Sequence, residues 1–293
     1  QKQSAFFKNL ASQPNVYFQQ EFYGFLMKDN PRFVGIFPNE KNWNDTDYAL
    51  AYKKYKERFA NAGDFEFYFV GNIDDNLIEE YSTKYIASLP SNSTKDKVVD
   101  LGYRMAKGDL KKVVNKGSDE KSNVTIMFYG DAQYNSKDAL AMDALGEVLT
   151  IKLIEELREN ESGVYGISAR GSMSKIPNES FSFTIGFPCG PENTEKLTAS
   201  ALKELQKIID NGPDEKDVLK YKEAELLEFK KNSKENKFWL SNFSKAFTTS
   251  SNPAEIVNME EKINAVTAQD IQNIAKKYLT KDKVIGILLP EKK

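Results

Sequence analysis

Arg158 and Tyr165 carry a guanidinium and a phenol, two strong hydrogen-bond donors, seven residues apart. Arg158 ends an expected helix, and Gly163 permits a sharp turn before an expected strand that carries Tyr165. This geometry could bring a guanidinium and a phenol to one rim, where both donate hydrogen bonds without exchanging a proton at pH 7. Two such donors could bind a peptide carbonyl and its developing oxyanion. Taken alone, the pattern favours a structural interpretation, with an arginine complementing the helix macrodipole and a tyrosine at a strand edge.

Histidine is absent from all 293 residues, and Cys189 is the single cysteine. Ser-His-Asp and Cys-His arrangements are therefore excluded, as is an imidazole that binds zinc or transfers a proton near neutral pH. One cysteine also excludes an intrachain disulfide and a cysteine-based metal site. We expect that this chain binds no zinc and no other cofactor, so any function uses carboxylates, Lys, Arg, Tyr or the backbone, or depends on another polypeptide.

The composition is that of a globular protein with one large domain or two of ordinary size. The 41 basic and 43 acidic residues give a net charge of -2, which offers no indication of nucleic-acid binding. No apolar run approaches the roughly 18 residues of a membrane span, so no span is expected. No signal peptide is visible and the chain begins at Gln1, which suggests a processed protein or an expression fragment.

Apolar periodicity predicts an α+β fold with mostly antiparallel sheets and helices packed on one face. Helices are expected over 14–29, from a cap at 44–46 to 59, and over 74–87, 137–159, 193–210, 214–247, 253–263 and 267–279. Strands are expected over 65–70, 124–128, 164–169, 181–187 and 284–289, with a hairpin loop over 174–180.

The chain contains a weak internal repeat. The helix that follows Thr46 carries Lys-Lys-Tyr and precedes the expected strand 65–70, and the helix that follows Thr267 carries the same tripeptide and precedes the expected strand 284–289. The second copy ends a complete unit, so the first resembles the tail of a similar unit whose beginning is absent. Chance is an equal alternative, because helix, break and strand are a common succession.

An ordered set of segments resembles the pitrilysin/insulinase family of zinc peptidases. The Leu-Arg-Glu at 157–159 and the Gly-Val-Tyr-Gly at 163–166 resemble the family's Leu-Arg-Glu…Gly-Val-Tyr segment. Further segments resemble the opening strand of the later domains (121–126), the strand-to-helix step (187–192), the end of the preceding domain (59–65 and 70–74) and its terminus (89–90).

The resemblance implies four homologous α+β domains that form two halves around a closed chamber. In that family the N-terminal half carries the zinc motif His-x-x-Glu-His, and the C-terminal half places an arginine and a tyrosine over the substrate. This chain resembles the C-terminal half. Duplicated metallopeptidase-like domains are then expected, with the first one truncated: the rear of a third domain over 1–90, a linker and entry strand over 91–120, and a complete C-terminal domain over 121–293.

Under this resemblance, Arg158 and Tyr165 are donors to the substrate carbonyl and oxyanion of a zinc metalloendopeptidase acting on peptides or unfolded polypeptides. Zinc belongs to the N-terminal half, so this chain alone is expected to be inactive. The expected partners are the N-terminal half, as the same polypeptide or a separate subunit, and a peptide substrate. Two alternatives stay open: a non-catalytic scaffold or assembly subunit of the same fold, and a stand-alone peptide-binding module that uses strand addition. The bacterial periplasm and the cytoplasm are both open as compartments.

Overall fold

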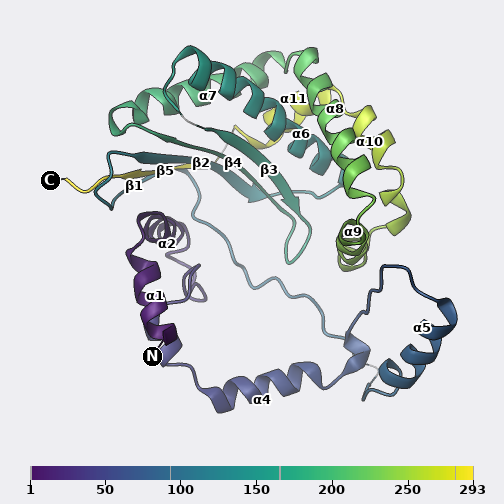
Figure 1. The fold of residues 1–293 in the computed structure, drawn as a ribbon. Helices are drawn as coiled ribbons and strands as arrows, with labels where there is room; N and C mark the ends of the chain where they lie inside the picture. Colours follow the sequence, from purple (N-terminus) through teal and green to yellow (C-terminus); the bar gives the residue numbers. More distant parts are fainter. Residues whose placement is uncertain (1, 93, 165, 281, 293) are drawn as a thin grey trace. The chain divides into compact units, whose positions relative to one another are not determined.

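The computed structural model describes residues 2–92, 94–164, 166–280 and 282–292. The chain forms two compact units. The first unit comprises Gln1–Glu40, Asp100–Leu226 and Glu261–Lys293, and it contains the β-sheet (Figure 1). The second unit comprises Lys41–Val99 and Leu227–Glu260.

The sheet of the first unit has five strands in the order β1-β5-β2-β4-β3. The strands are β1 (Asp109–Asn115), β2 (Ser122–Asp131), β3 (Ser168–Ser174), β4 (Ser180–Cys189) and β5 (Lys283–Leu289). Every neighbouring pair is antiparallel except β1 and β5, which run parallel. The antiparallel α+β fold expected from the sequence is therefore confirmed.

Three helices cover one face of this sheet: α6 (Ser136–Leu153), α7 (Thr194–Asn211) and α11 (Ala268–Tyr278) (Figure 1). Alternate residues of β4 point into this layer, so its burial alternates strictly along the strand. Ile126, Phe183 and Leu145 are fully buried in the resulting core. This helical layer fixes the position of the C-terminal end of α6. Arg158 lies in the segment that continues from this end.

Helix α2 (Pro14–Leu26) packs on the opposite face of the sheet, against β1 and β5. It buries Phe18 and Phe22 beside Val284 in a second, smaller core. Gly286 permits this approach, because a Cβ atom there would lie 2.6 Å from Cε2 of Phe22. A glycine on β5 is thus the condition for the docking of α2.

We expect Gly286→Val to lower the free energy of unfolding by about 1–3 kcal/mol, the usual cost of overpacking, and to expose α2 to solvent. Thermal denaturation and amide hydrogen exchange over 14–26 measure the two effects. Gly24→Ala in the same helix is the matched control, since its Cβ would meet nothing within 4 Å and alanine favours the helix. Unchanged exchange over α2 in Gly286→Val would contradict this account.

The remaining helical segments connect these layers or build the second unit. They are α1 (Lys2–Ser12), α3 (Glu40–Asn44), α4 (Tyr48–Phe59), η1 (Ala62–Asp64), α5 (Asp75–Tyr81), η2 (Ser82–Ile86), η3 (Ile154–Asn160), η4 (Pro191–Asn193), α8 (Glu215–Asn232), α9 (Asn236–Thr248), η5 (Pro253–Ile256) and α10 (Met259–Ala265). The cap of α4 is Asp47, whose side chain accepts from the Leu50 amide, so the prediction of a cap at 44–46 is wrong.

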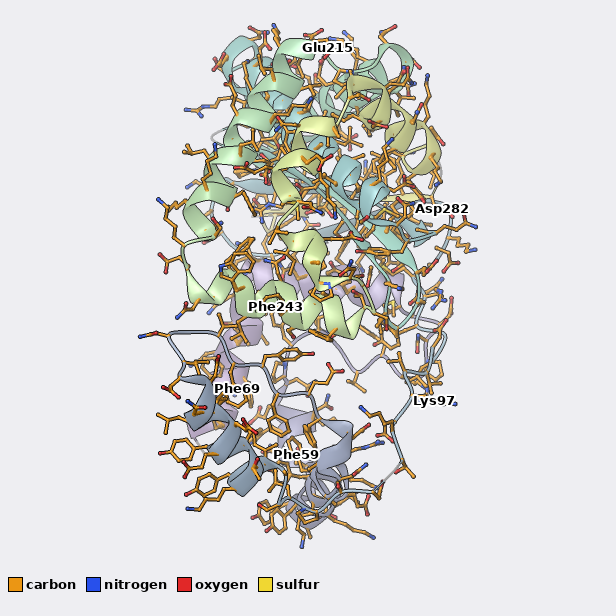
Figure 2. All side chains as sticks on the ribbon, turned by 90° about the vertical axis from the view of Figure 1, so that its right-hand side faces the viewer. Phe59, Phe69, Lys97, Glu215, Phe243 and Asp282 are labelled. Carbon is orange, nitrogen blue, oxygen red and sulfur yellow. The ribbon has the colours of Figure 1, made fainter. Side chains whose placement is uncertain are left out.

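The second unit exposes many large aromatic side chains. Tyr48, Tyr55 and Phe59 of α4 are all more than half exposed, and Phe59 and Phe69 are labelled in Figure 2. The prediction of a strand over 65–70 is wrong, because this segment is in neither a helix nor a strand. Its alternating phenylalanines have the period of a strand, but no neighbouring strand is paired with it among the described residues.

Candidate functional site

Arg158 lies on a π-helical continuation of α6. The regular α-helix ends at Leu153, and residues Ile154–Asn160 follow with the wider π winding. The sequence predicted helix through to 159 and gave no sign of this change. Single π turns inside α-helices occur frequently at functional sites, and here the π segment follows the end of α6 and carries Arg158.

The turn after the π segment is held by packing and by backbone hydrogen bonds. Leu157 is fully buried in the core, and its carbonyl accepts from the Gly163 amide at 2.9 Å. Ser162 has the left-handed backbone, with φ of 50°. Gly163 is required for space instead, since a Cβ there would lie 2.7 Å from Cδ2 of Leu197. The turn therefore uses two residues for two different reasons.

After this turn the chain rejoins the sheet. Val164 forms an isolated antiparallel bridge with Cys189 at the end of β4. Of the described residues in the strand expected over 164–169, Ser168 and Ala169 belong to β3. The Arg158 segment is thus anchored on both sides, by Leu157 in the core and by Val164 at the sheet.

The Arg158 side chain is exposed. Among the residues that the structure describes, none forms a hydrogen bond or an ion pair with its guanidinium. Its planar fork of donors is therefore available to a ligand. Tyr165, the second predicted donor, lies outside the described residues.

Glu161 is the acidic side chain of the same turn. Its carboxylate lies 2.6 Å from Nζ of Lys196, and hydrogen bonding from Lys196 and then Ser200 holds the pKa of Glu161 below its ordinary value. Glu161 therefore stays ionised at neutral pH, and Lys196 neutralises its charge.

A partly buried ionic cluster lies where α6 passes into the π segment. Nζ of Lys152 is 2.6 Å from Asp214 and 2.9 Å from Asp217, whose side chain is fully buried. The cluster joins the end of α6 to the start of α8. Sequence reasoning missed it, because the partners are more than 60 residues apart and nothing local marks an ion pair.

Within the described residues, no group of three or more His, Cys, Asp or Glu side chains is arranged to hold a metal ion. Cys189 is buried, and burial followed by the charge of Glu192 raises the pKa of its thiol to about 11. The donors at hand do not fit a zinc site. Separately, no helix among the described residues has both the length and the apolar character needed to cross a bilayer.

Similar proteins include bacterial zinc proteases. The chain is 25% identical over 171 residues to the probable zinc protease PqqL of Haemophilus influenzae. The aligned segment covers 58% of this chain and 18% of that protein. It is 21% identical over 240 residues to the Escherichia coli protein of the same name. This alignment covers 80% of this chain and 26% of that protein. The chain therefore spans about a quarter or less of these relatives.

Solved structures share the fold. The periplasmic protease PqqL from Escherichia coli superposes with a TM-score of 0.83 at 20% identity, over 99% of this chain and 32% of that chain. A peptidase M16 inactive domain from Pseudomonas fluorescens superposes with a TM-score of 0.80 at 15% identity. The superposition covers 99% of this chain and 69% of that chain. At these low sequence identities, the two superpositions show that the fold is shared and no more.

The family model described as the peptidase M16 inactive domain matches residues 51–225. This match covers more than half of the chain and includes α6, the π segment and the strands that anchor it. It agrees with the resemblance to the non-zinc half of pitrilysin/insulinase peptidases. The chain belongs to the peptidase M16 inactive-domain family.

Proposed function

We propose that this chain is the C-terminal, substrate-binding half of a zinc-dependent metalloendopeptidase that acts on peptides or unfolded polypeptides. The zinc site belongs to an N-terminal half, which is part of the same polypeptide or a partner subunit. The observation that carries the proposal is the Arg158 guanidinium, exposed and without a partner among the described residues, on a π-helical segment anchored at both ends.

In this role Arg158 binds the substrate carbonyl oxygen. A guanidinium stays charged at any physiological pH and presents several N–H groups in one plane. Its hydrogen bonds strengthen as negative charge grows on that oxygen, so they lower the barrier more than they tighten ground-state binding. Tyr165 is proposed as the second donor on the family resemblance alone. The metal-dependent chemistry is supplied elsewhere, and this chain contributes binding and charge stabilisation.

The domain division is part of the same proposal. Residues 1–90 are the rear of a third domain, 91–120 are a linker and entry strand, and 121–293 are a complete fourth domain. The exposed aromatics of α4 and the unpaired segment 65–70 support the first assignment, because aromatic side chains of this size are normally buried. The preceding part of the third domain would cover them and pair with 65–70.

The edges of the sheet argue against a stand-alone module that adds a peptide strand. At the outer edge of β3, Oγ1 of Thr150 accepts from the Ala169 amide at 2.7 Å and donates to its carbonyl at 3.2 Å. At the other edge, β1 carries Lys111 and Lys112 in an exposed strand. The satisfied amide and carbonyl of Ala169 and the lysines on β1 both discourage the pairing of a further strand.

Reconstitution tests the proposal. We expect this chain alone to give negligible cleavage of a fluorogenic peptide, and cleavage to appear when it is mixed with the half that carries His-x-x-Glu-His. The reason is that the donors act only where a metal-bound nucleophile attacks the carbonyl that they hold. Hydrolysis rate and co-elution on size exclusion are measured together.

The zinc half alone is the necessary control. Full activity of that half without this chain would favour the scaffold alternative. Robust cleavage by this chain alone, in a preparation free of other peptidases, would refute the proposed division of labour.

A further inference from the structure

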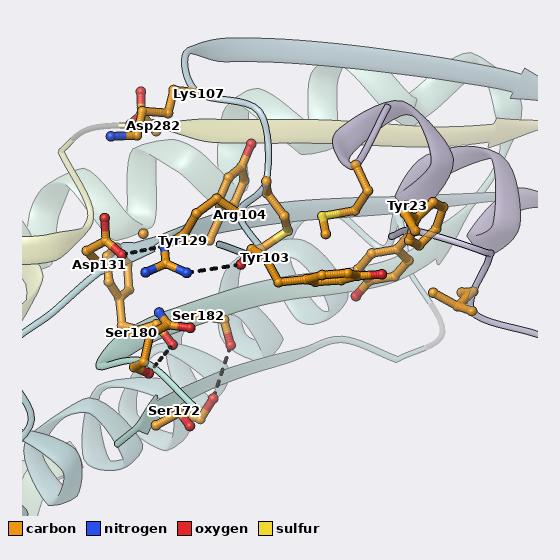
Figure 3. Close-up of a pocket in the computed structure, with 18 of the residues that line it drawn as sticks. Tyr23, Tyr103, Arg104, Lys107, Tyr129, Asp131, Ser172, Ser180, Ser182 and Asp282 are labelled. Carbon is orange, nitrogen blue, oxygen red and sulfur yellow. Dashed lines mark hydrogen bonds and ion pairs between the residues drawn. The ribbon is translucent and has the colours of Figure 1, made fainter. Parts of the chain in front are cut away.

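A cavity of about 410 Å³ lies in the first unit beside the end of α2, and the residues that line it do not include Arg158. It is bounded by the ends of β2 and of the β3–β4 hairpin, by the end of α2 and the loop after it, and by residues 103–107 (Figure 3). Its volume is within the range of pockets that bind small organic ligands.

Aromatic rings dominate the wall of the cavity. They come from separate parts of the chain: Tyr23 from α2, Phe33 from the following loop, Tyr103 from the entry segment, Tyr129 from β2 and Phe181 from β4. Rings converging in this way favour another planar apolar group through edge-to-face and offset contacts. The preferred guest is therefore an aromatic ring.

Hydroxyl groups line one side of the cavity. Ser172 of β3 and Ser182 of β4 lie opposite each other, with their Oγ atoms 3.0 Å apart (Figure 3). Ser180 lies two residues before Ser182 on the same strand, and it also lines the cavity. Hydroxyls donate and accept, so this side can hydrogen-bond the uncharged amide groups of a polypeptide backbone.

The charges of the side chains that line the cavity sum to zero, and most of these side chains form ion pairs or hydrogen bonds within the protein. Nε of Arg104 is 2.9 Å from Asp131, and its Nη2 is 2.7 Å from Asp100. Asp282 accepts from the Gly108 amide, and Lys107 is the second cation of the wall. The lining thus contains two cations and two anions. A neutral ring suits this wall, whereas a free aromatic amino acid would bring in both a carboxylate and an ammonium group.

We propose that this cavity binds an aromatic side chain of the polypeptide substrate, as an anchor separate from Arg158. This inference rests on the proposed function, since the peptide is the guest. Phe181 lies near the start of β4, and Val164 bridges Cys189 at its end. Eight strand residues span about 27 Å. An extended substrate therefore reaches from the anchor to the region of Arg158 in roughly eight residues or more.

Direct binding to this chain tests the anchor without any catalysis. The probe is a short fluorescein-labelled peptide of glycine and serine with one central tryptophan, and its partner carries alanine at the centre. Fluorescence anisotropy should give affinity for the tryptophan peptide about tenfold to a hundredfold higher, which is the effect of burying one large apolar side chain. Equal affinity for the two peptides would overturn the proposal.

Two pairs of variants locate the binding. Ser182→Trp fills the cavity and should remove the preference for tryptophan. Thr184→Trp, on the same face of β4 and outside the lining, should keep it. Tyr103→Ala should weaken binding of the tryptophan peptide about tenfold. Leu101→Ala, in the same segment and also exposed, should not. Loss of the preference in the control of either pair would contradict this location.

The outcome for the anchor is independent of the outcome for peptidase activity. If mixed halves show no hydrolysis and Ser182→Trp still abolishes the tryptophan preference, the proposed function fails and the anchor stands. If hydrolysis occurs and the preference is absent, the anchor fails alone. N-acetyl-tryptophan amide can be used as a competitor of the labelled tryptophan peptide. If it binds with the same affinity as the whole peptide, the cavity is a small-molecule site and the assignment of a polypeptide as its ligand is wrong.

Discussion

Under the proposed function, replacing Arg158 with lysine in the assembled peptidase is expected to lower kcat by about 10²–10³-fold, the usual cost of losing an oxyanion donor. Lysine keeps the positive charge but lacks the planar fork, so it cannot reproduce the hydrogen bonds to the carbonyl oxygen. Because Arg158 is exposed and has no partner among the described residues, the melting temperature should stay within a degree or two of the wild-type value. Steady-state kinetics and thermal denaturation together measure the effect.

Arg58→Lys is the matched control, since Arg58 is exposed and forms a surface ion pair with Asp96. It should leave kcat unchanged. Tyr165→Phe removes a single hydroxyl and should lower kcat by a similar factor if Tyr165 is the second donor. Wild-type turnover in both Arg158→Lys and Tyr165→Phe would end the assignment of these residues to the reaction.

Lys152→Met is expected to lower the free energy of unfolding by about 3 kcal/mol, the lower part of the range for breaking a buried ion pair. The variant leaves the fully buried Asp217 with Lys220 alone, whose side chain is 56% exposed. The melting temperature should fall by about 6–12 °C. Lys111→Met, which breaks the exposed pair with Glu195, should change stability by less than about 0.5 kcal/mol.

The effect of Lys152→Met should depend on pH. Burial alone would raise the pKa of Asp217, but hydrogen bonds from Lys152 and Lys220 outweigh it and hold the pKa below its ordinary value. The carboxylate therefore stabilises the wild-type fold above the ordinary aspartate pKa, and this stabilisation is lost as the pH falls through the lowered one. Without Lys152, burial favours the protonated acid.

The difference in melting temperature between wild type and Lys152→Met should accordingly shrink as the pH is lowered from 7 toward 4. Lys152→Met combined with Asp217→Asn removes both charges and should recover part of the loss at pH 7. A difference that stays constant over this pH range would show that lost packing of the lysine stem, and not the buried charge, causes the destabilisation.

The sequence predicted the elements whose burial has a regular period. The alternation over 181–187 predicted β4, and the apolar spacing over 137–159 predicted α6. The helix expected over 267–279 is α11, with Thr267 in a capping box with Asp270. These elements form the main core, where periodicity follows directly from facing one buried layer.

Elements whose formation depends on distant partners could not be predicted. Apolar periodicity did not predict β1, and only the family resemblance placed an entry strand within 91–120. Strand β1 is a mostly exposed edge strand with charged residues, and its pairing with β5 joins segments about 174 residues apart. The expected helix over 214–247 is divided at 233–235 into α8 and α9. The apolar periodicity of a segment shows which of its faces is buried. It does not show which other segment packs against that face.

The place of Arg158 at the end of a helix was predictable, and the π winding of that helix end was not. Arg158 at the end of a helix follows from the apolar spacing of Leu153 and Leu157, which both remain buried. The π winding keeps these two leucines in the core, so the apolar pattern is the same as for an α-helix. The cavity near Tyr23 was not predicted, because its walls come from five separate stretches of chain.

The π winding of Ile154–Asn160 also makes the site sensitive to chain length. Each residue of an α-helix advances the side chains by about 100° around the axis, and a π segment accommodates its residues with a wider turn. Deleting one residue here would allow regular winding to return, with Leu157 or Arg158 forced onto another side of the helix. Substitutions on the exposed side of this segment are then far better tolerated in evolution than single-residue insertions or deletions, and related chains should keep a constant number of residues between the end of α6 and Val164.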